Sequence, residues 1–312
     1  MNVISGVASL KKPLSNTVVT IGNFDGLHVG HKKILKTVLD EAQKINGKTV
    51  VFTLNPHPSE VLTPHKSLPK INTLEEKITL IEHQGIDTLI LEPFTQKLAR
   101  KTPEEFFNDV LLKKLQPKVI VVGHDFRFGH KRKGDIKLLQ NLGIHNKIKI
   151  IEIPPFTLKK TIASSSLIRE AIQNGNVEKA HIFLGRPFFL AGSVISGSGR
   201  GKKINTPTAN LYVGNRLIPG DGVYIIQTEY EGKLFPSVGS VGRNITFSET
   251  EPPTIEVFLL DFDKKLYDKK LILHYLKKIR VMKKFRTVLE LQEAIRHDIR
   301  KARRYFKLSA SN

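Results

Sequence analysis

A glycine-rich segment near the amino terminus carries the residues best suited to chemistry. Residues 22–31 are GNFDGLHVGH, in which two histidines lie three positions apart between a β-branched run and an amphipathic helical pattern. A strand that leads through such a turn into a helix directs free N–H groups and the positive end of the helix dipole at an anion. His28 and His31 would lie on nearly one face of the first helical turn, where protonated or donating imidazoles can bind phosphate oxygens. We therefore predict a site that stabilises a phosphate whose charge builds up during transfer.

The first half of the chain alternates strand and helix patterns, which predicts a parallel sheet covered by helices. In such sheets ligands bind beyond the carboxyl ends of the strands, and segment 22–31 begins at one of these ends. The expected strands are residues 18–21, 49–53, 88–91, 119–122 and 148–153. The expected helices are residues 31–44, 74–84, 103–115 and 165–174.

Three further polar segments follow predicted strands or open a predicted helix. Residues 55–58 are NPHP, residues 123–129 are GHDFRFG, and residues 164–169 are SSSLIR. Taken singly, each has a plain structural explanation as a helix cap or a loop. Their convergence on strand ends of one sheet instead indicates a common site, in which the Ser165 hydroxyl and the Arg169 guanidinium would bind phosphate. The sequence has no Walker P-loop, HExxH motif or cysteine, which argues against Walker-type and zinc chemistry.

From about residue 187, short strand patterns separated by glycine-rich turns replace the alternation. This change predicts an antiparallel barrel or sandwich, closed by a final helix over residues 288–305. We place the domain boundary between residues 184 and 185, which gives domains 1–184 and 185–312. The expected strands of the second domain are residues 190–195, 223–230, 234–238, 254–260 and 271–275.

The second half also offers groups that could hold phosphate and metal. A basic glycine-rich loop begins at residue 197, and such loops suit phosphates. Thr208 and Asn210, two residues apart on an expected strand, would present oxygen atoms on one face, and Mg²⁺ prefers oxygen ligands. Glu256 interrupts an apolar strand pattern, where it is either a general base that faces a cavity or a solvent-facing residue of ordinary alternation. The loop residues that could bind phosphate are Gly197, Gly199, Arg200 and Gly201.

Several of these strings resemble the signatures of one enzyme family. The His-x-Gly-His element resembles that of the nucleotidyltransferase superfamily, and the whole segment 22–31 is similar to that of the bacterial bifunctional riboflavin kinase/FAD synthetases. The resemblance extends to FTLNPHPSEVL at 52–62, INTLEEK at 71–77, VVGHDFRFG at 121–129 and SSSLIREAI at 164–172, and it runs through nearly the whole chain. It implies a Rossmann-like nucleotidyltransferase domain with a parallel sheet, followed by an antiparallel β-barrel with a terminal helix.

The resemblance also implies a pair of ATP-dependent reactions that need Mg²⁺. In the second domain riboflavin would be phosphorylated to FMN, with Glu256 taking the ribityl hydroxyl proton and Thr208 and Asn210 holding Mg-ATP. In the first domain FMN would be adenylated to FAD with release of pyrophosphate, and His28 and His31 would stabilise the transferring phosphate. The implied ATP and phosphate ligands are Gly22, Phe24, Gly30, Ser165, Arg169, Gly197, Gly199, Arg200 and Gly201. The implied flavin ligands are Asn55, Asp125, Phe126 and Arg127.

Some residues depart from the family's pattern and leave other interpretations open. Asn55 stands where an acidic residue is common, and Val281-Met282 stands where the family often carries acidic residues near the flavin. One alternative is an FMN adenylyltransferase whose kinase-like domain is impaired or only binds flavin. Another is a non-catalytic RNA-binding protein on an enzyme scaffold, whose RNA binding would weaken steeply with salt.

Composition limits the class of protein. The 312 residues are 40% hydrophobic, which suffices for real cores, and they include no bilayer-spanning run and no signal-peptide pattern. The absence of cysteine excludes disulfides and fits a cytoplasmic protein. The net charge of +21 comes from dispersed basic residues, so we expect small-molecule substrates and neither a nucleic-acid nor a membrane partner. The sequence leaves the oligomeric state open.

Overall fold

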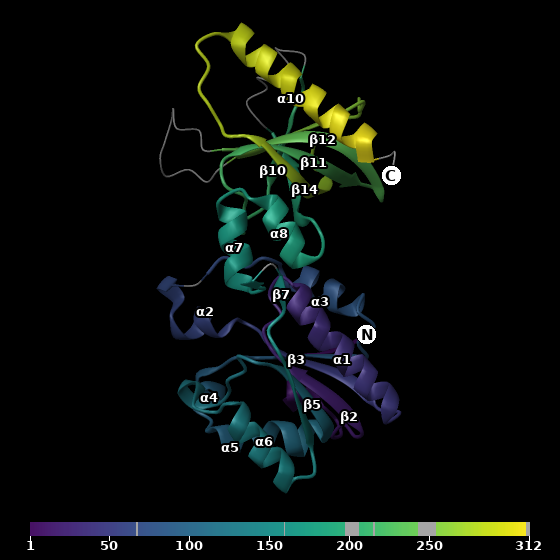
Figure 1. Ribbon diagram of the computed structural model, residues 1–312, viewed down its shortest axis with the longest axis vertical. Coiled ribbons are helices and arrows are strands. Elements are labelled where there is room, and N and C mark those ends of the chain that lie inside the picture. The colour runs from purple at the N-terminus through teal and green to yellow at the C-terminus, as the bar shows by residue number, and fades with distance from the viewer. Residues whose placement is uncertain (67, 159, 197–205, 215, 243–253, 310–312) are drawn as a thin grey trace. The chain divides into compact units, whose positions relative to one another are not determined.

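The chain forms two compact units, Met1–Ser165 and Ser166–Asn312 (Figure 1). The computed structural model describes residues 1–312 except 67, 159, 197–205, 215, 243–253 and 310–312. By residue contacts the division lies between Ser165 and Ser166, so the chain from 166 to 184 is grouped with the second unit. The domain boundary expected between residues 184 and 185 stays a prediction.

The first unit contains the predicted parallel sheet. Its strand order is β1-β4-β3-β2-β5-β6, and every neighbouring pair is parallel. The strands are β1 (Asn2–Ile4), β2 (Thr17–Ile21), β3 (Lys48–Leu54), β4 (Thr88–Glu92), β5 (Pro117–Gly123) and β6 (Lys149–Ile153). A separate antiparallel ribbon consists of β7 (Thr157–Leu158) and β8 (Thr161–Ile162).

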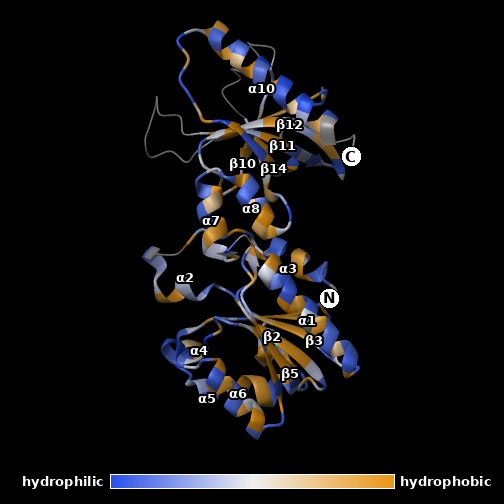
Figure 2. Cartoon of the chain, viewed as in Figure 1, coloured by the Kyte–Doolittle hydropathy of each residue, from blue (hydrophilic) through white to orange (hydrophobic). Residues whose placement is uncertain are grey.

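Helices bury both faces of this sheet, which is why its strands are apolar along almost their whole length (Figure 2). Val18 and Val51 pack with α1 and α3 on one face, whereas Val19 and Phe52 pack with α5, η3 and α6 on the other. The helices are α1 (Val29–Lys44), α2 (Pro58–Leu62), α3 (Leu74–Glu82), α4 (Gln96–Ala99), α5 (Pro103–Phe106), the π-helix η3 (Phe107–Leu115) and α6 (Ile136–His145). Short 3-10 turns are η1 (Val7–Ser9), η2 (Pro64–Lys66) and η4 (His130–Arg132).

The strand order reverses direction at the centre of the sheet. From β2 the chain continues through β3 to β4 on one side, and β5 then returns to pair with β2 on the other. In open α/β sheets a ligand crevice forms at such a switch point, outside the carboxyl ends of the strands. The segments that follow β2 and β5, residues 22–31 and 123–129, therefore meet at this edge.

The second unit contains the predicted barrel, closed in the order β10-β13-β12-β11-β14-β9 with every pairing antiparallel. Before the barrel, α8 packs against β14 and β9. The strands are β9 (Phe188–Ile195), β10 (Ala209–Tyr212), β11 (Gly222–Tyr230), β12 (Lys233–Gly242), β13 (Thr254–Leu259) and β14 (Lys270–Arg280). The helices are α7 (Ser165–Gln173), α8 (Val177–Leu184) and α10 (Val288–Ser309).

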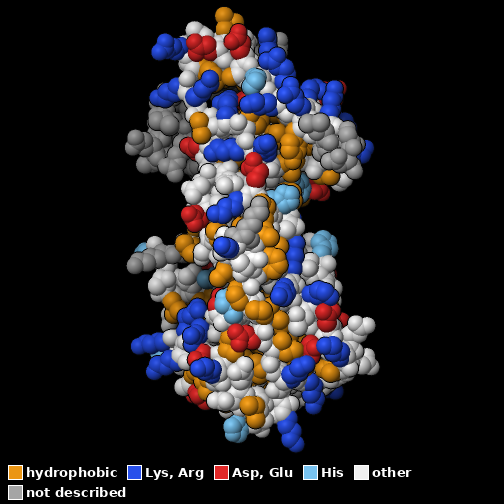
Figure 3. All heavy atoms as spheres, viewed as in Figure 1, with side chains coloured by type: hydrophobic (Ala, Val, Ile, Leu, Met, Phe, Trp, Pro, Cys, Tyr) orange, Lys and Arg blue, Asp and Glu red, His pale blue; other side chains and the backbone are white. Residues whose placement is uncertain are grey.

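Helix α10 covers part of the outer surface of the barrel. Val241 and Val257 are buried inside, while Val238 and Phe258, on the opposite face of their strands, pack outside against the helix around Ala302. Figure 3 shows Lys and Arg side chains spread over the visible faces of both units and interspersed with Asp and Glu. Among the described helices, none is both long and apolar enough to cross a membrane.

Candidate active sites

The turn between β2 and α1 holds the two histidines in fixed positions. His28 is the N-cap of α1, and its Nδ1 accepts a hydrogen bond from the backbone N–H of His31 at 3.3 Å. The two imidazoles are stacked with ring centroids 3.6 Å apart, and the Phe24 ring meets His31 edge-on at 5.2 Å. Phe24 and Leu27 both have positive φ, so the turn is tight on either side of Gly26. The predicted pairing of His28 with His31 is thus present in the fold.

Burial keeps both imidazoles neutral. The His28 side chain is buried, and its desolvation lowers the pKa of the imidazole to about 4, although the charges of Asp125 and Asp25 oppose the change. Burial also lowers the pKa of His31 well below its ordinary value, with His28 and Lys77 adding to the effect. Because Nδ1 of His28 accepts a hydrogen bond, the proton of its neutral ring is on Nε2. The sequence left open whether the imidazoles act as protonated cations or as neutral hydrogen-bond donors. Their lowered pKa values favour neutral donors.

Two glycines of the segment leave room for the aromatic rings. A Cβ at Gly30 would lie 3.1 Å from the His28 ring, and a Cβ at Gly22 would lie 3.1 Å from the Phe24 ring. Both contacts are tighter than ordinary van der Waals packing, so a larger residue would displace the rings. Direct binding of ATP by Gly22, Phe24 and Gly30 stays a prediction.

Asp25 ties the turn to the segment before α3. Its buried carboxylate accepts hydrogen bonds from the backbone N–H groups of Ile71 and Asn72, at 3.1 and 3.4 Å. Its carbonyl oxygen accepts one from the hydroxyl of Ser165 at 2.9 Å. Ser165, predicted to bind ATP phosphates, therefore lies beside the histidine turn, whereas Arg169 belongs to the second unit and its role stays a prediction.

Lys77 and His57 contact the same turn, and sequence reasoning assigned neither a role. The Lys77 ammonium donates to the carbonyl oxygen of Asn23 at 2.8 Å, and the side-chain amide of Asn23 lies 3.0 Å from Nε2 of His57. His57 in turn caps α2, where its Nδ1 accepts the backbone N–H of Ser59. The signals in the sequence that could have identified them are the motifs INTLEEK, which ends with Lys77, and NPHP, which contains His57.

The predicted flavin ligands of segment 123–129 extend from the neighbouring strand β5. The Asp125 carboxylate is close enough for its charge to act on His28. Phe126 stacks on Phe128 with ring centroids 5.5 Å apart, and Arg127 forms an exposed ion pair with Asp135 at 3.3 Å. Asn55 lies at the end of neighbouring β3. Asp125 is thus close to the turn that carries His28, while flavin binding by these residues stays a prediction.

A second polar site lies on the outside of the barrel. The Thr208 hydroxyl donates to Oε2 of Glu256 at 3.3 Å, and Asn210 is the direct cross-strand partner of Glu256 between β10 and β13. Directly paired residues of antiparallel strands point to the same face. Since Ile255 and Val257 are buried on the opposite face, the half-buried Glu256 carboxylate faces outward with Thr208 and Asn210. The four predicted loop ligands, Gly197, Gly199, Arg200 and Gly201, lie outside the described residues.

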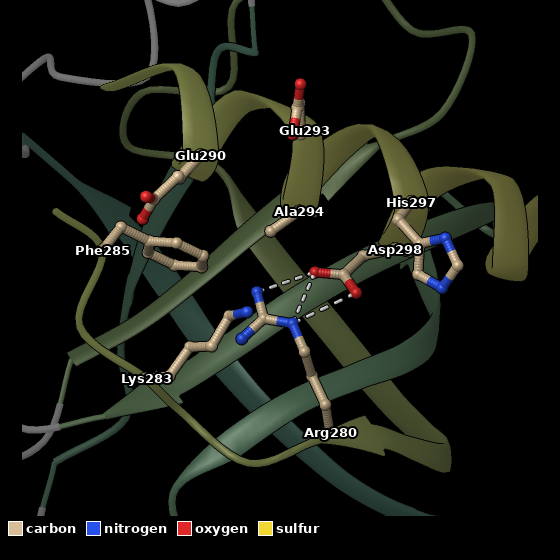
Figure 4. A pocket seen from close by; sticks show the side chains of 8 residues that line it. All are labelled: Arg280, Lys283, Phe285, Glu290, Glu293, Ala294, His297 and Asp298. Atoms are coloured by element: carbon tan, nitrogen blue, oxygen red, sulfur yellow. Dashed lines mark hydrogen bonds and ion pairs between the residues drawn. The ribbon is translucent and has the colours of Figure 1, made fainter. Parts of the chain in front are cut away.

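A cavity of about 330 Å³ lies between the end of β14 and α10 (Figure 4). At its base Arg280 donates to the buried carboxylate of Asp298 at 2.8 and 3.0 Å. The Phe285 ring lies 5.0 Å from the Lys283 ammonium and 5.7 Å from the Arg280 guanidinium. The remaining lining residues are Glu290, Glu293, Ala294 and His297.

Comparison with known proteins identifies the family of this chain. The family model described as FAD synthetase matches residues 10–167, and the one described as riboflavin kinase matches residues 184–306. The chain is 36% identical over 311 residues to the bifunctional riboflavin kinase/FMN adenylyltransferase of Buchnera aphidicola subsp. Schizaphis graminum, covering 99% of this chain and 100% of the relative. The chain belongs to the bifunctional riboflavin kinase/FMN adenylyltransferase family.

Other relatives are similar to this chain over nearly its whole length. The family members of Bacillus subtilis and Escherichia coli are 36% and 33% identical to this chain and cover 95% and 99% of it, with the same shares of their own lengths. A crystal structure described as a macrolide-efflux protein from Streptococcus pneumoniae superposes with a TM-score of 0.89 at 32% identity, over 96% of this chain and 98% of that one. The similarity to these proteins therefore covers nearly the whole chain.

Proposed function

We propose that this chain phosphorylates riboflavin with ATP to give FMN and ADP, and then adenylates FMN with a second ATP to give FAD and pyrophosphate. The observation that supports the proposal is the presence of two separate polar clusters in a chain that belongs to this family. One is the stacked His28–His31 pair at the switch point of the sheet, and the other is the Thr208–Glu256 contact beside Asn210 on the barrel. Each site lies in the unit that the corresponding family model covers.

In adenylyl transfer, a phosphate oxygen of FMN attacks the α-phosphorus of ATP, and the bond to the bridging oxygen breaks as pyrophosphate leaves. Catalysis of this kind needs positioning and stabilisation of charge on the phosphoryl oxygens. Neutral His28 and His31 donate hydrogen bonds to those oxygens, and the free N–H groups at the start of α1 add to them. Ser165 binds the ATP phosphates, and Asp125, Phe126 and Arg127 contact the flavin nucleotide, while a role for Arg169 stays a prediction.

In the kinase reaction, Glu256 accepts the proton of the ribityl 5′-hydroxyl while that oxygen attacks the γ-phosphorus of ATP and ADP leaves. The Thr208 hydroxyl donates to the carboxylate and so fixes its orientation. A positioned carboxylate of this kind typically contributes about 10²–10⁴-fold to the rate. The half-buried position of Glu256 limits the access of water to it.

The donor set beside Glu256 fits Mg²⁺ held jointly with ATP. A hydroxyl and an amide oxygen are neutral oxygen ligands, and Mg²⁺ is commonly bound by few protein groups together with substrate phosphates and water. Within the described part of the chain, no cluster of three His, Cys, Asp or Glu residues forms an all-protein metal cage. Thr208 and Asn210 would hold the ion, which neutralises charge on the ATP phosphates when bound.

The cavity beside Phe285 suits the flavin ring of the kinase substrate. Glu256, Ser240, Val223 and Arg280 are successive cross-strand partners on the outer face of the barrel. With neighbouring strands about 4.8 Å apart, Arg280 lies roughly 14 Å from Glu256 along this row. Riboflavin bound along it would place the ribityl hydroxyl at Glu256 and the isoalloxazine ring against Phe285.

Product analysis by mass tests the proposal. Riboflavin and Mg-ATP should yield FMN and FAD with the wild-type chain. His28→Asn, which retains a good helix cap, should still form FMN but lose FAD formation by about 100-fold or more. Glu256→Gln should lose FMN formation and still convert supplied FMN to FAD. Intact FAD synthesis in His28→Asn would refute the first site.

The same assay distinguishes the adenylyltransferase-only alternative. A chain that converts supplied FMN to FAD but makes no FMN from riboflavin would support an impaired kinase unit. The match of the riboflavin kinase family model to residues 184–306 favours the bifunctional enzyme instead. The cytoplasm as the place of reaction stays a prediction.

A further inference from the structure

The adenylyl-transfer site needs positive charge that its histidines do not supply. The reaction brings the phosphate of FMN together with the triphosphate of ATP, and charge then develops on the departing pyrophosphate. Neutral imidazoles donate hydrogen bonds but do not offset a net charge, and both His28 and His31 have strongly lowered pKa values. A side-chain cation close to the turn would therefore have a specific role.

Lys77 lies where such a cation is needed. It belongs to the first turns of α3, which starts at a capping box formed by Thr73 and Glu76. Its Nζ donates to the Asn23 carbonyl oxygen at 2.8 Å, inside the same turn that carries His28. Its charge acts on His31, one of the stacked pair. An ammonium has three donors, and the Asn23 carbonyl accepts one of them.

The surroundings of Lys77 differ from those of a structural lysine. In the part of the chain that the structure describes, no carboxylate lies within 4.0 Å of its ammonium. The nearby Asp25 carboxylate already accepts backbone hydrogen bonds from the segment at Ile71 and Asn72. Lys70, seven residues earlier, has the ordinary arrangement, because it pairs with Glu60 at 2.9 Å. Partial burial of an ammonium without a paired carboxylate is costly unless an anionic ligand compensates for it.

We propose that Lys77 binds the ATP triphosphate in the adenylyl-transfer site and stabilises the negative charge of the departing pyrophosphate. The inference rests on the proposed function of the first unit. The bond from the FMN phosphate oxygen to the α-phosphorus forms as the bond from that phosphorus to the bridging oxygen breaks. The electron pair stays on pyrophosphate, and Lys77 stays protonated throughout, so it contributes charge and a hydrogen bond but transfers no proton.

Three substitutions in the full-length chain separate a charge role from a structural one. Lys77→Met removes the charge and the donor, Lys77→Gln keeps a neutral donor for the Asn23 carbonyl, and Lys77→Arg keeps the charge. Lys36→Met is the matched control, because Lys36 is an exposed lysine of α1 paired with Asp40. FAD formation from supplied FMN, inhibition by added pyrophosphate, and FMN formation from riboflavin are measured for each variant.

A charge role gives a distinct pattern of results. FAD formation should fall by about 100-fold in both Lys77→Met and Lys77→Gln, with weaker inhibition by pyrophosphate, and Lys77→Arg should recover much of the loss. FMN formation should stay at the wild-type rate in all variants, and Lys36→Met should match the wild type in both reactions. Hydrogen exchange over β2 and β3 establishes that the first unit of each variant is folded.

Other results would overturn the inference. Full FAD formation in Lys77→Gln would show that Lys77 only fastens the turn through the Asn23 carbonyl. Equal FAD formation by Lys77→Met and the wild type would remove Lys77 from the site altogether, while leaving the proposed adenylyl transfer intact. A wild-type chain that forms no FAD from FMN and Mg-ATP would instead refute the proposed function, and the role of Lys77 with it.

Discussion

Lowering the pH from 7 to 5 should destabilise the first unit through His28. In the folded chain burial lowers the pKa of this imidazole from 6.5 to about 4. In the unfolded chain the imidazole is solvated and regains its ordinary pKa. Between these two values the unfolded state binds more protons than the folded state, so stability is complete above pH 6.5 and falls as the pH approaches 4.

The size of the effect follows from the two pKa values. One pKa unit corresponds to about 1.4 kcal/mol, so the complete loss, reached below pH 4, is about 3.5 kcal/mol. Between pH 7 and pH 5 the linked loss is about 2 kcal/mol. This is a large fraction of the stability of an ordinary domain, which is about 5–15 kcal/mol. His31 contributes in the same direction, because burial lowers its pKa as well.

Urea unfolding followed by pulsed hydrogen exchange measures this loss in the intact chain. Peptides from β2 and β3 report on the first unit separately from the barrel, which matters because the chain has no tryptophan to serve as a local probe. The comparison is with His28→Asn, since asparagine can still cap α1 but does not titrate. The variant should lose about 2 kcal/mol less than the wild type between pH 7 and pH 5.

An equal loss in the wild type and His28→Asn would refute the reasoning. So would a wild-type His28 resonance that titrates near 6.5 in a histidine NMR titration, assigned by its absence from His28→Asn. Either result would mean that the imidazole is solvated or charged in the folded state. The description of His28 and His31 as neutral donors, and the need for charge from Lys77, would then fall.

Further predictions concern stability in each unit. Asp298→Ala leaves the Arg280 guanidinium unpaired under α10 and should cost about 3–5 kcal/mol, seen as a lower calorimetric midpoint of the barrel, whereas Arg303→Ala breaks an exposed pair and should hardly move it. Gly129→Ala should lower the urea midpoint of the first unit, because Gly129 has a φ of 70° and its Cβ would lie 2.5 Å from a backbone atom; an unchanged midpoint would contradict this. Phe107→Ala should cost about 3–5 kcal/mol of unfolding free energy in the same assay, since the ring is fully buried. A loss below about 1 kcal/mol would show that neighbouring side chains move in and fill the space left by the ring.

Local patterns in the sequence predicted most elements of both units. The apolar strands β2 to β6 stand out because both faces of the sheet are covered, and the barrel strands stand out through alternation between glycine-rich turns. β1 is only three residues long, too short for a period to be visible. α6 was missed, and its interior Gly143 weakens the helical signal. That glycine is required by tertiary packing, because a Cβ there would lie 2.9 Å from the carbonyl oxygen of Ile148.

The predicted helix over residues 103–115 shows the limit of periodicity. The helix begins at Pro103 as predicted, and Thr102 and Glu105 form a capping box at its start. Beyond Phe106 the segment continues as the π-helix η3, which buries Phe107 and Leu111 against the sheet. A π-helix is rare and mostly occurs as a short insertion within an α-helix, so the apolar spacing predicted a helix here without distinguishing the two types.

The sequence by itself determined the order of most elements and supplied the motifs from which His28, His31, Thr208 and Glu256 are predicted to handle phosphate. These depend on short-range periodicity, turn chemistry and residue type, all of which are local. Only the tertiary structure decided that the histidines are neutral and that Lys77 reaches their turn from α3. Burial and proximity depend on contacts between residues far apart in the chain. Lys77 and Asn23 are 54 positions apart, and only the folded sheet brings them together.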